Sequence, residues 1–395
     1  MIRVSSGFEA GAIEILAASS ESKKTAAATS IRLAIRADST SDPACDFRQW
    51  FYFRVHDVRD VALEITLTNA GATTYPNGWR DYRACASYDR VHWFRVPTRY
   101  VDGTLLISHR SERSSIYFAY FEPYLWERHL RLLAELEATG AAAISPLAST
   151  ADGRDLDVVT LGSAGSARAD AKKVAKKVWI IARQHPGESM AEWFAEGFMR
   201  RLVDRYDAVA RRVLERCVVR VVPNMNPDGS VRGNLRASGT GANLNREWLN
   251  PTLERSPEVL AVRDCIHATG VDFFLDVHGD EALPYVFVAG AEMLPHFTAA
   301  QRLEQQRFCA AFERASPDFQ TKHGYPSGSF SADSLKLASK YVADRFGCLS
   351  LTLEMPFKDN ANLPDEKYGW NGARSARLGA ALVQAIAEWA ESSGE

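Results

Sequence analysis

The segment from Lys177 to Trp193 restricts the fold of this chain more than any other. It starts with an uninterrupted apolar run, residues 178–182, which is short enough to be a strand buried on both faces. Pro186 and Gly187 then mark a sharp turn, and helix-forming residues follow from Ser189 onward. A buried strand, a turn and a helix in this order are typical of an α/β sheet with helices packed on its faces.

The turn in this segment carries two side chains that can bind a metal, His185 and Glu188. Imidazole and carboxylate are both good Zn²⁺ ligands, and a catalytic zinc commonly takes three protein ligands and leaves one position for water. The H-x-x-E spacing alone is weak, because a chain of this composition contains about one such pair by chance. Its position after a predicted strand strengthens it, since sites in open α/β sheets collect at the carboxyl ends of strands.

Length and composition are those of an ordinary globular protein. The 395 residues are enough for two domains, and 46% apolar residues allow a sizeable core. A net charge of -2 gives no reason to expect nucleic acid as a partner. The chain has no apolar run that could span a bilayer and no signal-peptide pattern, so we expect no membrane association. Its six scattered cysteines, without a C-x-x-C, indicate reduced thiols and a cytoplasmic protein. The sequence does not indicate the oligomeric state.

Two differently patterned parts follow each other along the chain. Residues 1–138 contain short β-branched and aromatic runs separated by Gly, Asn and Asp, which predicts a β-sandwich, followed by a connecting helix at 124–138. Residues 139–395 alternate apolar strand runs with helical patterns, which predicts an α/β domain with helices on both faces of the sheet. We therefore expect domains at 1–138 and 139–395, with the linker in the Ala-rich stretch that begins at 139.

Four predicted strands of the second part end in polar residues of catalytic type. The strand runs are 178–182, 218–222, 273–277 and 348–353, and they lead respectively to His185 with Glu188, to Asn224–Gly229, to His278 and to Glu354. His185, Glu188 and His278 together supply two imidazoles and a carboxylate for Zn²⁺ and leave a fourth position open. A single strand-end histidine is better explained by a hydrogen bond to nearby backbone. Four such endings at one edge of a sheet indicate a site.

Glu354 and two arginines have the chemistry to complete this site. Zinc lowers the pKa of its water to about 7, so a carboxylate such as Glu354 can take the proton near neutrality. Arg246 with Asn245 can clamp a carboxylate, because a guanidinium fork matches a carboxylate bidentately. Arg236 can face a developing oxyanion. Taken singly, each arginine is better explained as a surface residue.

These motifs together resemble the M14 family of zinc carboxypeptidases, in particular its cytosolic-carboxypeptidase-like branch. The order His-x-x-Glu, Asn-Pro-Asp-Gly, Asn-Arg, His-Gly, Glu is that family's order and extends over residues 178–356. The run 50–55, the turn 75–78 and the segment 118–124 resemble the β-sandwich domain of the branch. The resemblance covers nearly the whole chain. It implies a mixed eight-stranded carboxypeptidase-type sheet flanked by helices and preceded by an all-β sandwich domain.

The resemblance also implies a role for each matching residue. One Zn²⁺ per chain is expected on His185, Glu188 and His278. Glu354 is expected to activate the water and Arg236 to contact the scissile carbonyl. The terminal carboxylate of a peptide or protein substrate is expected to meet the clamp, which consists of Asn245 and Arg246.

This chain departs from the family pattern at one position and leaves a second position open. The family usually has Asp two residues before the Asn-Arg pair, where it supports a zinc-ligand histidine, and this chain has Asn243 there. An amide oxygen still accepts the imidazole N–H, but it raises ligand basicity less than a carboxylate does. The sequence does not fix the tyrosine that many members place near the site, and Tyr325 and Tyr341 are both candidates.

Substrate preference is predicted from Lys340. The segment 339–342 resembles the place where the cytosolic branch carries a basic residue, so Lys340 is a candidate to attract a Glu or Asp side chain of the substrate. The alternative is a solvated helix face, because Lys336 and Lys340 lie one helical turn apart.

Three functions fit these residues to different degrees. The first is a metallocarboxypeptidase that prefers acidic C-terminal residues. The second is a zinc amidase or deacylase acting on a small acylated amino acid or a cell-wall peptide. The third is a non-catalytic binding protein, which requires a missing ligand or base. The carboxylate clamp favours the first function, and the complete set of site residues argues against the third.

Overall fold

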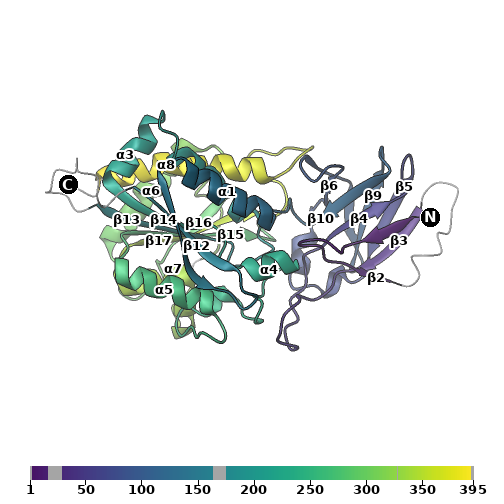
Figure 1. Cartoon of the computed structure of the whole chain (residues 1–395), viewed down its shortest axis with the longest axis horizontal. Helices are drawn as coiled ribbons and strands as arrows, with labels where there is room; N and C mark the ends of the chain where they lie inside the picture. Colours follow the sequence, from purple (N-terminus) through teal and green to yellow (C-terminus); the bar gives the residue numbers. More distant parts are fainter. Residues whose placement is uncertain (1, 17–28, 163–174, 327, 393–395) are drawn as a thin grey trace.

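The computed structural model describes residues 2–16, 29–162, 175–326 and 328–392. The β-rich N-terminal part lies at one end of the molecule, and the α/β part occupies the other end (Figure 1). Among the described residues, no helix combines the length and the apolar character needed to cross a membrane.

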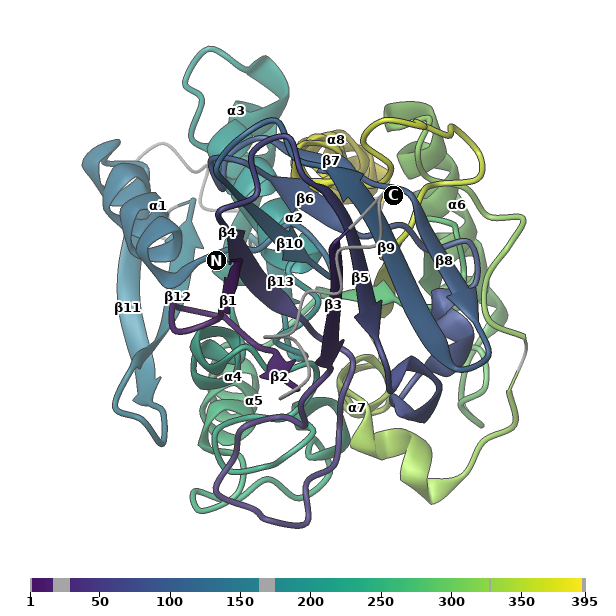
Figure 2. The same cartoon turned by 90° about the vertical axis from the view of Figure 1, so that its right-hand side faces the viewer.

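The N-terminal part is built from two five-stranded sheets. The strands of the first, in sheet order, are β1 (Arg3–Ser5), β4 (Tyr52–His56), β10 (Ser115–Ala119), β6 (Cys85–Ser87) and β7 (Trp93–Arg95). The strands of the second are β2 (Glu14–Ile15), β3 (Thr29–Ala34), β5 (Ala62–Leu67), β9 (Thr104–Arg110) and β8 (Thr98–Val101). Figure 2 views this part from its outer side, with the α/β part behind it. Alternate residues of β5 are buried, as a strand with one face on a core requires, so the predicted sandwich is confirmed.

The second part contains a mixed seven-stranded sheet in the described residues. Its order is β11 (Ala142–Ser149), β12 (Asp155–Leu161), β14 (Cys217–Val222), β13 (Lys176–Ala182), β15 (Phe273–Asp280), β17 (Leu349–Pro356) and β16 (Phe287–Ala289). The four strands β14, β13, β15 and β17 run parallel to one another, and the other three pair in antiparallel fashion. The predicted mixed sheet with flanking helices is confirmed, with seven strands described where eight were expected.

Helices cover both faces of this sheet (Figure 1). One face carries α1 (Trp126–Ala138), α2 (Met190–Leu202), α3 (Ala208–Arg216), α6 (Ala299–Ala315) and α8 (Gly372–Ser392). The other carries α5 (Pro257–Thr269) and α7 (Ala338–Phe346), and the short α4 (Pro227–Arg232) lies toward the sandwich. The central strand shows why two cores form. Val178 and Ile180 belong to the core under α2 and α8, whereas Trp179 and Ile181 belong to the core under α5 and α7.

Helices α2 and α8 pack closely because each has a glycine at the contact. A Cβ atom added to Gly197 would collide with the backbone carbonyl of Ala376, and one added to Gly379 would collide with that of Phe194. The helix-forming residues that follow Ser189 in the sequence form α2. In the structure it ends at Leu202, and a separate helix α3 follows.

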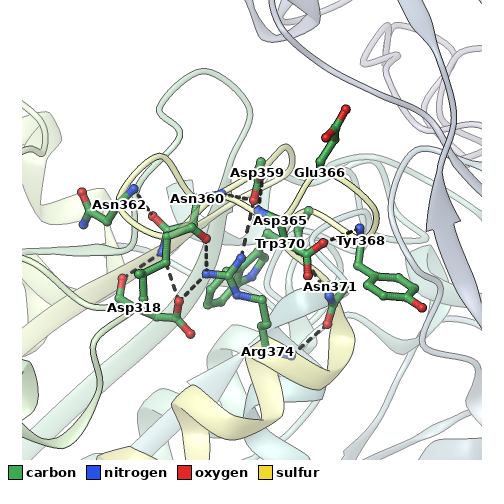
Figure 3. A network of polar contacts seen from close by, with 12 residues as sticks. Asp318, Asp359, Asn360, Asn362, Asp365, Glu366, Tyr368, Trp370, Asn371 and Arg374 are labelled. Carbon is green, nitrogen blue, oxygen red and sulfur yellow. Dashed lines mark hydrogen bonds and ion pairs between the residues drawn. The ribbon is translucent and has the colours of Figure 1, made fainter.

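The loop between β17 and α8 is fixed by a polar network (Figure 3). The guanidinium of Arg374 at the start of α8 contacts the carboxylates of Asp318 and Asp359 and donates to the carbonyl of Leu363 at 2.9 Å. From the N-terminal part, Arg95 donates to the carbonyls of Phe357 and Trp370, at 2.8 and 2.9 Å. This loop starts just after Glu354, so these contacts hold the strand end that carries the expected base.

Candidate active site

The predicted strand endings meet at one edge of the sheet. Strands β13 and β17 both pair in parallel with β15, and in this register His278 lies directly beside Glu354. The chain leaves β13 through Arg183, whose φ of 61° turns the backbone sharply. The buried Arg183 side chain secures the turn, because its Nε donates to the carbonyl of Pro186 at 2.9 Å and its Nη1 contacts Glu192 at 2.7 Å.

His185, Glu188 and His278 form a buried group with the donors of a metal site. Oε1 of Glu188 is 2.7 Å from Nδ1 of His185, and its Oε2 is 2.8 Å from Nδ1 of His278. One ligand atom from each of the three residues lies within 4.8 Å of the other two. Two imidazole nitrogens and one carboxylate that converge in this way fit the donor set of a catalytic zinc site.

Each histidine of this group is oriented by a second oxygen atom. Nε2 of His185 is 3.0 Å from Oδ1 of Asn243, so the amide occupies the position where the family usually has Asp. Nε2 of His278 is 2.8 Å from Oδ2 of Asp276, which also accepts a hydrogen bond from Gln184. His278 is thus supported by the carboxylate of Asp276, and His185 by the amide of Asn243.

Burial and charge set the protonation of the three residues. Burial, reinforced by the nearby guanidinium of Arg236, lowers the pKa of His185 to about 3, so this imidazole is neutral. Burial opposes the charged form of His278, but the carboxylates of Asp276 and Glu188 outweigh it and raise its pKa well above the usual value. Burial likewise opposes the carboxylate of Glu188, but the two imidazoles outweigh it and lower its pKa. Glu188 is therefore ionised, which is the state that binding of a metal ion requires.

Glu354 lies beside this group with one oxygen available. Its Oε1 accepts a hydrogen bond from the hydroxyl of Tyr325 at 3.0 Å, and its buried Oε2 has no hydrogen-bond partner among the described residues. Burial raises the pKa of Glu354 well above its usual value, His278 opposes this rise, and Glu188 and Asp280 reinforce it.

The tyrosine at the site is Tyr325. Its hydroxyl oxygen lies 2.7 Å from Asp280 and 3.0 Å from Glu354, so the two carboxylates share its one proton. Tyr341 is instead hydrogen-bonded to His267 at 2.9 Å and packs against Trp248 in the core under α7.

The two arginines lie near the metal group, at different depths. Nη1 of Arg236 is 3.8 Å from Oε1 of Glu188, and only 12% of this side chain is exposed. Arg246 is exposed, and its Nη1 donates to the carbonyl of Asn245 at 2.7 Å. Burial of part of its side chain lowers the pKa of Arg246, and the charge of Arg236 reinforces this effect. Asn245 is buried, with its amide nitrogen 3.3 Å from Nε2 of His278.

Lys340 is buried in helix α7. Its residue surface is 7% exposed and its ammonium donates to the carbonyl of Gly290, whereas the Lys336 side chain is 44% exposed. The solvated-face explanation is therefore wrong for Lys340. Burial lowers its pKa, and the carboxylates of Glu292 and Asp276 oppose that effect.

Comparison with known proteins decides the family. The model of the cytosolic carboxypeptidase N-terminal domain matches residues 4–121, and the zinc carboxypeptidase model matches residues 130–371. The chain belongs to the zinc carboxypeptidase family. It is thus a metallopeptidase, a hydrolase that acts on peptide bonds, and the sequence-based prediction of family and enzyme class is confirmed.

Solved metallo-carboxypeptidases share the whole fold. A metallo-carboxypeptidase from Burkholderia cenocepacia is 54% identical, with a TM-score of 0.92 over 99% of this chain and 100% of that chain. A metallo-carboxypeptidase from Pseudomonas aeruginosa, in complex with (2-guanidinoethylmercapto)succinic acid, is 39% identical, with a TM-score of 0.89 and 98% coverage of both chains. Cytosolic carboxypeptidase 6 of Mus musculus is 29% identical over 73% of this chain, which covers 56% of the mouse protein.

Three residues near the site were not found from the sequence. Asp276 lies two residues before His278, and strand alternation alone could have placed both side chains on one face. Tyr75, in the turn that resembles the family, lies against Arg236, with its ring centroid 5.3 Å from the guanidinium carbon. Asp38 contacts the backbone around Arg236, and no local pattern marks it.

Proposed function

We propose that this protein removes C-terminal residues from peptides or proteins, with one zinc ion held by His185, Glu188 and His278. The observation that carries the proposal is the convergence of three buried ligands with Glu354 and Arg236 at one sheet edge. The donor set fits zinc, and the orphaned oxygen of Glu354 is the chemical feature that an attacking water requires.

Glu354 is the proposed general base. When bound, zinc would polarise the scissile carbonyl and lower the pKa of a bound water to about 7. Glu354 takes a proton from the attacking water through Oε2 and passes it to the nitrogen of the departing amino acid. Tyr325 holds the other oxygen, so the carboxylate keeps one orientation while the proton moves.

Arg236, Arg246 and Asn245 determine which peptide bond is hydrolysed. Arg236, which is largely buried beside Glu188, stabilises the negative charge that develops on the carbonyl oxygen. Arg246 and Asn245 bind the terminal carboxylate of the substrate, because the exposed guanidinium can form a bidentate pair there. A site with this clamp requires a free C-terminus and removes one residue at a time.

Lys340 is the proposed determinant of a preference for C-terminal Glu or Asp. A buried ammonium attracts an acidic side chain and repels Lys or Arg. The Pseudomonas aeruginosa relative favours a competing result, because its ligand carries a guanidino group as well as succinic acid. In this chain Asp276 and Glu292 lie near Lys340. If the substrate ended in Lys or Arg, these two carboxylates would be the groups available to pair with its side chain.

We also propose a cytoplasmic location. In the described residues all six cysteines are unpaired, and residues 4–121 match the N-terminal domain of cytosolic carboxypeptidases. The division into domains at 1–138 and 139–395 stays our proposal.

A peptide pool tests the function. Peptides with a randomised last residue, each made with a free and with an amidated C-terminus, are digested with the zinc-loaded protein and read by mass spectrometry. We expect single-residue losses from free peptides only, fastest for Glu and Asp, and no loss with a chelator until zinc is restored. Equal rates on amidated peptides would favour the zinc amidase, and faster loss of Lys or Arg would reverse the proposed preference.

A further inference from the structure

The N-terminal part reaches the active site through the loop that carries Arg236. We propose that Asp38 is a positioning residue for Arg236, so that the N-terminal part is a component of the catalytic machinery. This inference rests on the proposed role of Arg236 at the developing oxyanion.

Three successive backbone amides of the loop point at the carboxylate of Asp38. Oδ1 accepts from the N–H of Leu235 at 2.6 Å, and Oδ2 accepts from the N–H groups of Arg236 and Ala237, both at 2.8 Å. These bonds hold the backbone on both sides of the Arg236 Cα atom. The direction in which the arginine side chain leaves the loop is therefore set by a residue from the other part of the chain.

The opposite edge of the same loop is fixed to the turn that carries the metal ligands. The N–H of Gly187 donates to the carbonyl of Leu235 at 2.9 Å. A Cβ atom at Gly187 would lie 3.0 Å from both the Cα atom and the carbonyl oxygen of Leu235, so only glycine allows this approach without displacement. The loop is thus held between Asp38 on one side and the turn between His185 and Glu188 on the other.

The guanidinium of Arg236 is held from the N-terminal part as well. Its carbon lies 5.3 Å from the ring centroid of Tyr75, a cation–π distance. Tyr75 is itself held by Gln49, whose amide exchanges two hydrogen bonds with the Tyr75 backbone, both of 3.1 Å. Residues 38 and 75 therefore fix the backbone and the side chain of Arg236 independently.

A carboxylate is an unusual choice for this position if packing alone is considered. Asp38 is only 9% exposed, and burying a carboxylate is costly unless it is paired. Burial raises its pKa to about 6, although the three amides and Arg36 oppose the rise, so the group is ionised at neutral pH. An ionised carboxylate accepts at both oxygens and donates nothing, which is what three converging N–H groups require.

The test is Asp38→Asn in the full-length, zinc-loaded protein. The amide puts an NH₂ group against at least one N–H, so the loop must move. Because a displacement of about 1 Å can lower a rate about 100-fold, we expect kcat to fall about 10- to 100-fold, with KM and zinc content nearly unchanged. Hydrogen exchange of the amides of 235–237 should become faster.

A double-mutant cycle separates positioning from simple loss of structure. In an Arg236→Ala background, Asp38→Asn should lower kcat by no more than about twofold, because the group it positions is absent. Asp46→Asn is the matched control. This carboxylate also lies in the N-terminal part, but it is 77% exposed and pairs with Arg48, so we expect the change to leave kcat within about twofold.

The outcomes are distinct. If Asp38→Asn lowers kcat equally in both backgrounds, or leaves it unchanged in the parent, the inference is wrong while the role of Arg236 stands. If Arg236→Ala itself keeps the parent kcat, the proposed oxyanion role fails, and the inference fails with it. Should Asp38→Asn not fold, Asp38→Ser keeps one accepting oxygen, and a parent-like kcat in that variant would overturn the inference.

Discussion

Replacing Asn243 by Asp should strengthen zinc binding, and replacing Asp276 by Asn should weaken it. The two residues hold equivalent positions on the two histidines of the proposed zinc site, at 3.0 Å from Nε2 of His185 and 2.8 Å from Nε2 of His278. A carboxylate accepts the imidazole N–H more strongly than an amide and raises the basicity of the ligand nitrogen. Each substitution therefore changes the charge of the side chain and keeps its shape.

The structure predicts unequal effects for the two substitutions. Support residues of this kind typically change metal affinity about 10- to 100-fold, or about 1.4 to 2.7 kcal/mol. Asn243 already supplies an oxygen, so its replacement gains only charge, and we expect about a 10-fold tighter site. Oδ2 of Asp276 accepts from Gln184 at 2.8 Å as well as from His278. Two donors then depend on the single amide oxygen of the Asn variant, so we expect a loss of about 100-fold.

The assay is competition for zinc with a chromophoric chelator of known affinity, at fixed pH, on metal-free protein. Thermal unfolding of the metal-free variants checks that each is folded. Zinc affinities of both variants within about twofold of the parent would refute the reasoning, since they would mean that charge at these oxygens does not reach the metal.

Three further changes have defined results. His278→Ala should lose the ion, because two ligands remain, and full zinc content by elemental analysis would remove His278 from the ligand set. Arg246→Ala should raise KM with kcat nearly unchanged in steady-state kinetics on free peptides, because it removes a contact present in the ground state; a fall in kcat alone would contradict the clamp. Lys340→Glu should weaken or reverse the preference for C-terminal Glu over Lys, measured as a ratio of kcat/KM, while Lys336→Glu, on the exposed face, should leave that ratio unchanged.

The sequence predicted the elements that combine strong local pattern with burial. Strand β13 and the turn after it were recognisable because an apolar run ends in Pro and Gly, and the largely apolar run 273–277 marked the strand before His278. Strand β11 was missed and its start was taken as a linker. It lies at the edge of the sheet, contains Pro146 and has no fully buried residue, so neither alternation nor apolar content marks it.

Contacts between distant parts of the chain had no such signal. Asp38 and Arg236 come from different parts of the chain, and only the folded structure brings the carboxylate to the loop. The burial of Lys340 is a second example, because its spacing from Lys336 is that of a solvated helix face. In the structure the two lysines belong to different elements, because a short 3-10 helix (Ala332–Lys336) ends before α7 begins, and only Lys340 lies on the helix that packs against β17.

The most direct test of the central claim is to measure zinc content and peptide turnover in the same sample of Glu354→Gln. The amide keeps the size of the side chain and cannot take a proton from the attacking water. We expect one zinc per chain, as in the parent, and a kcat lower by about 10²- to 10⁴-fold. Hydrolysis at the parent rate with zinc retained would contradict the assignment of Glu354 as the base and, with it, the proposed chemistry of this site.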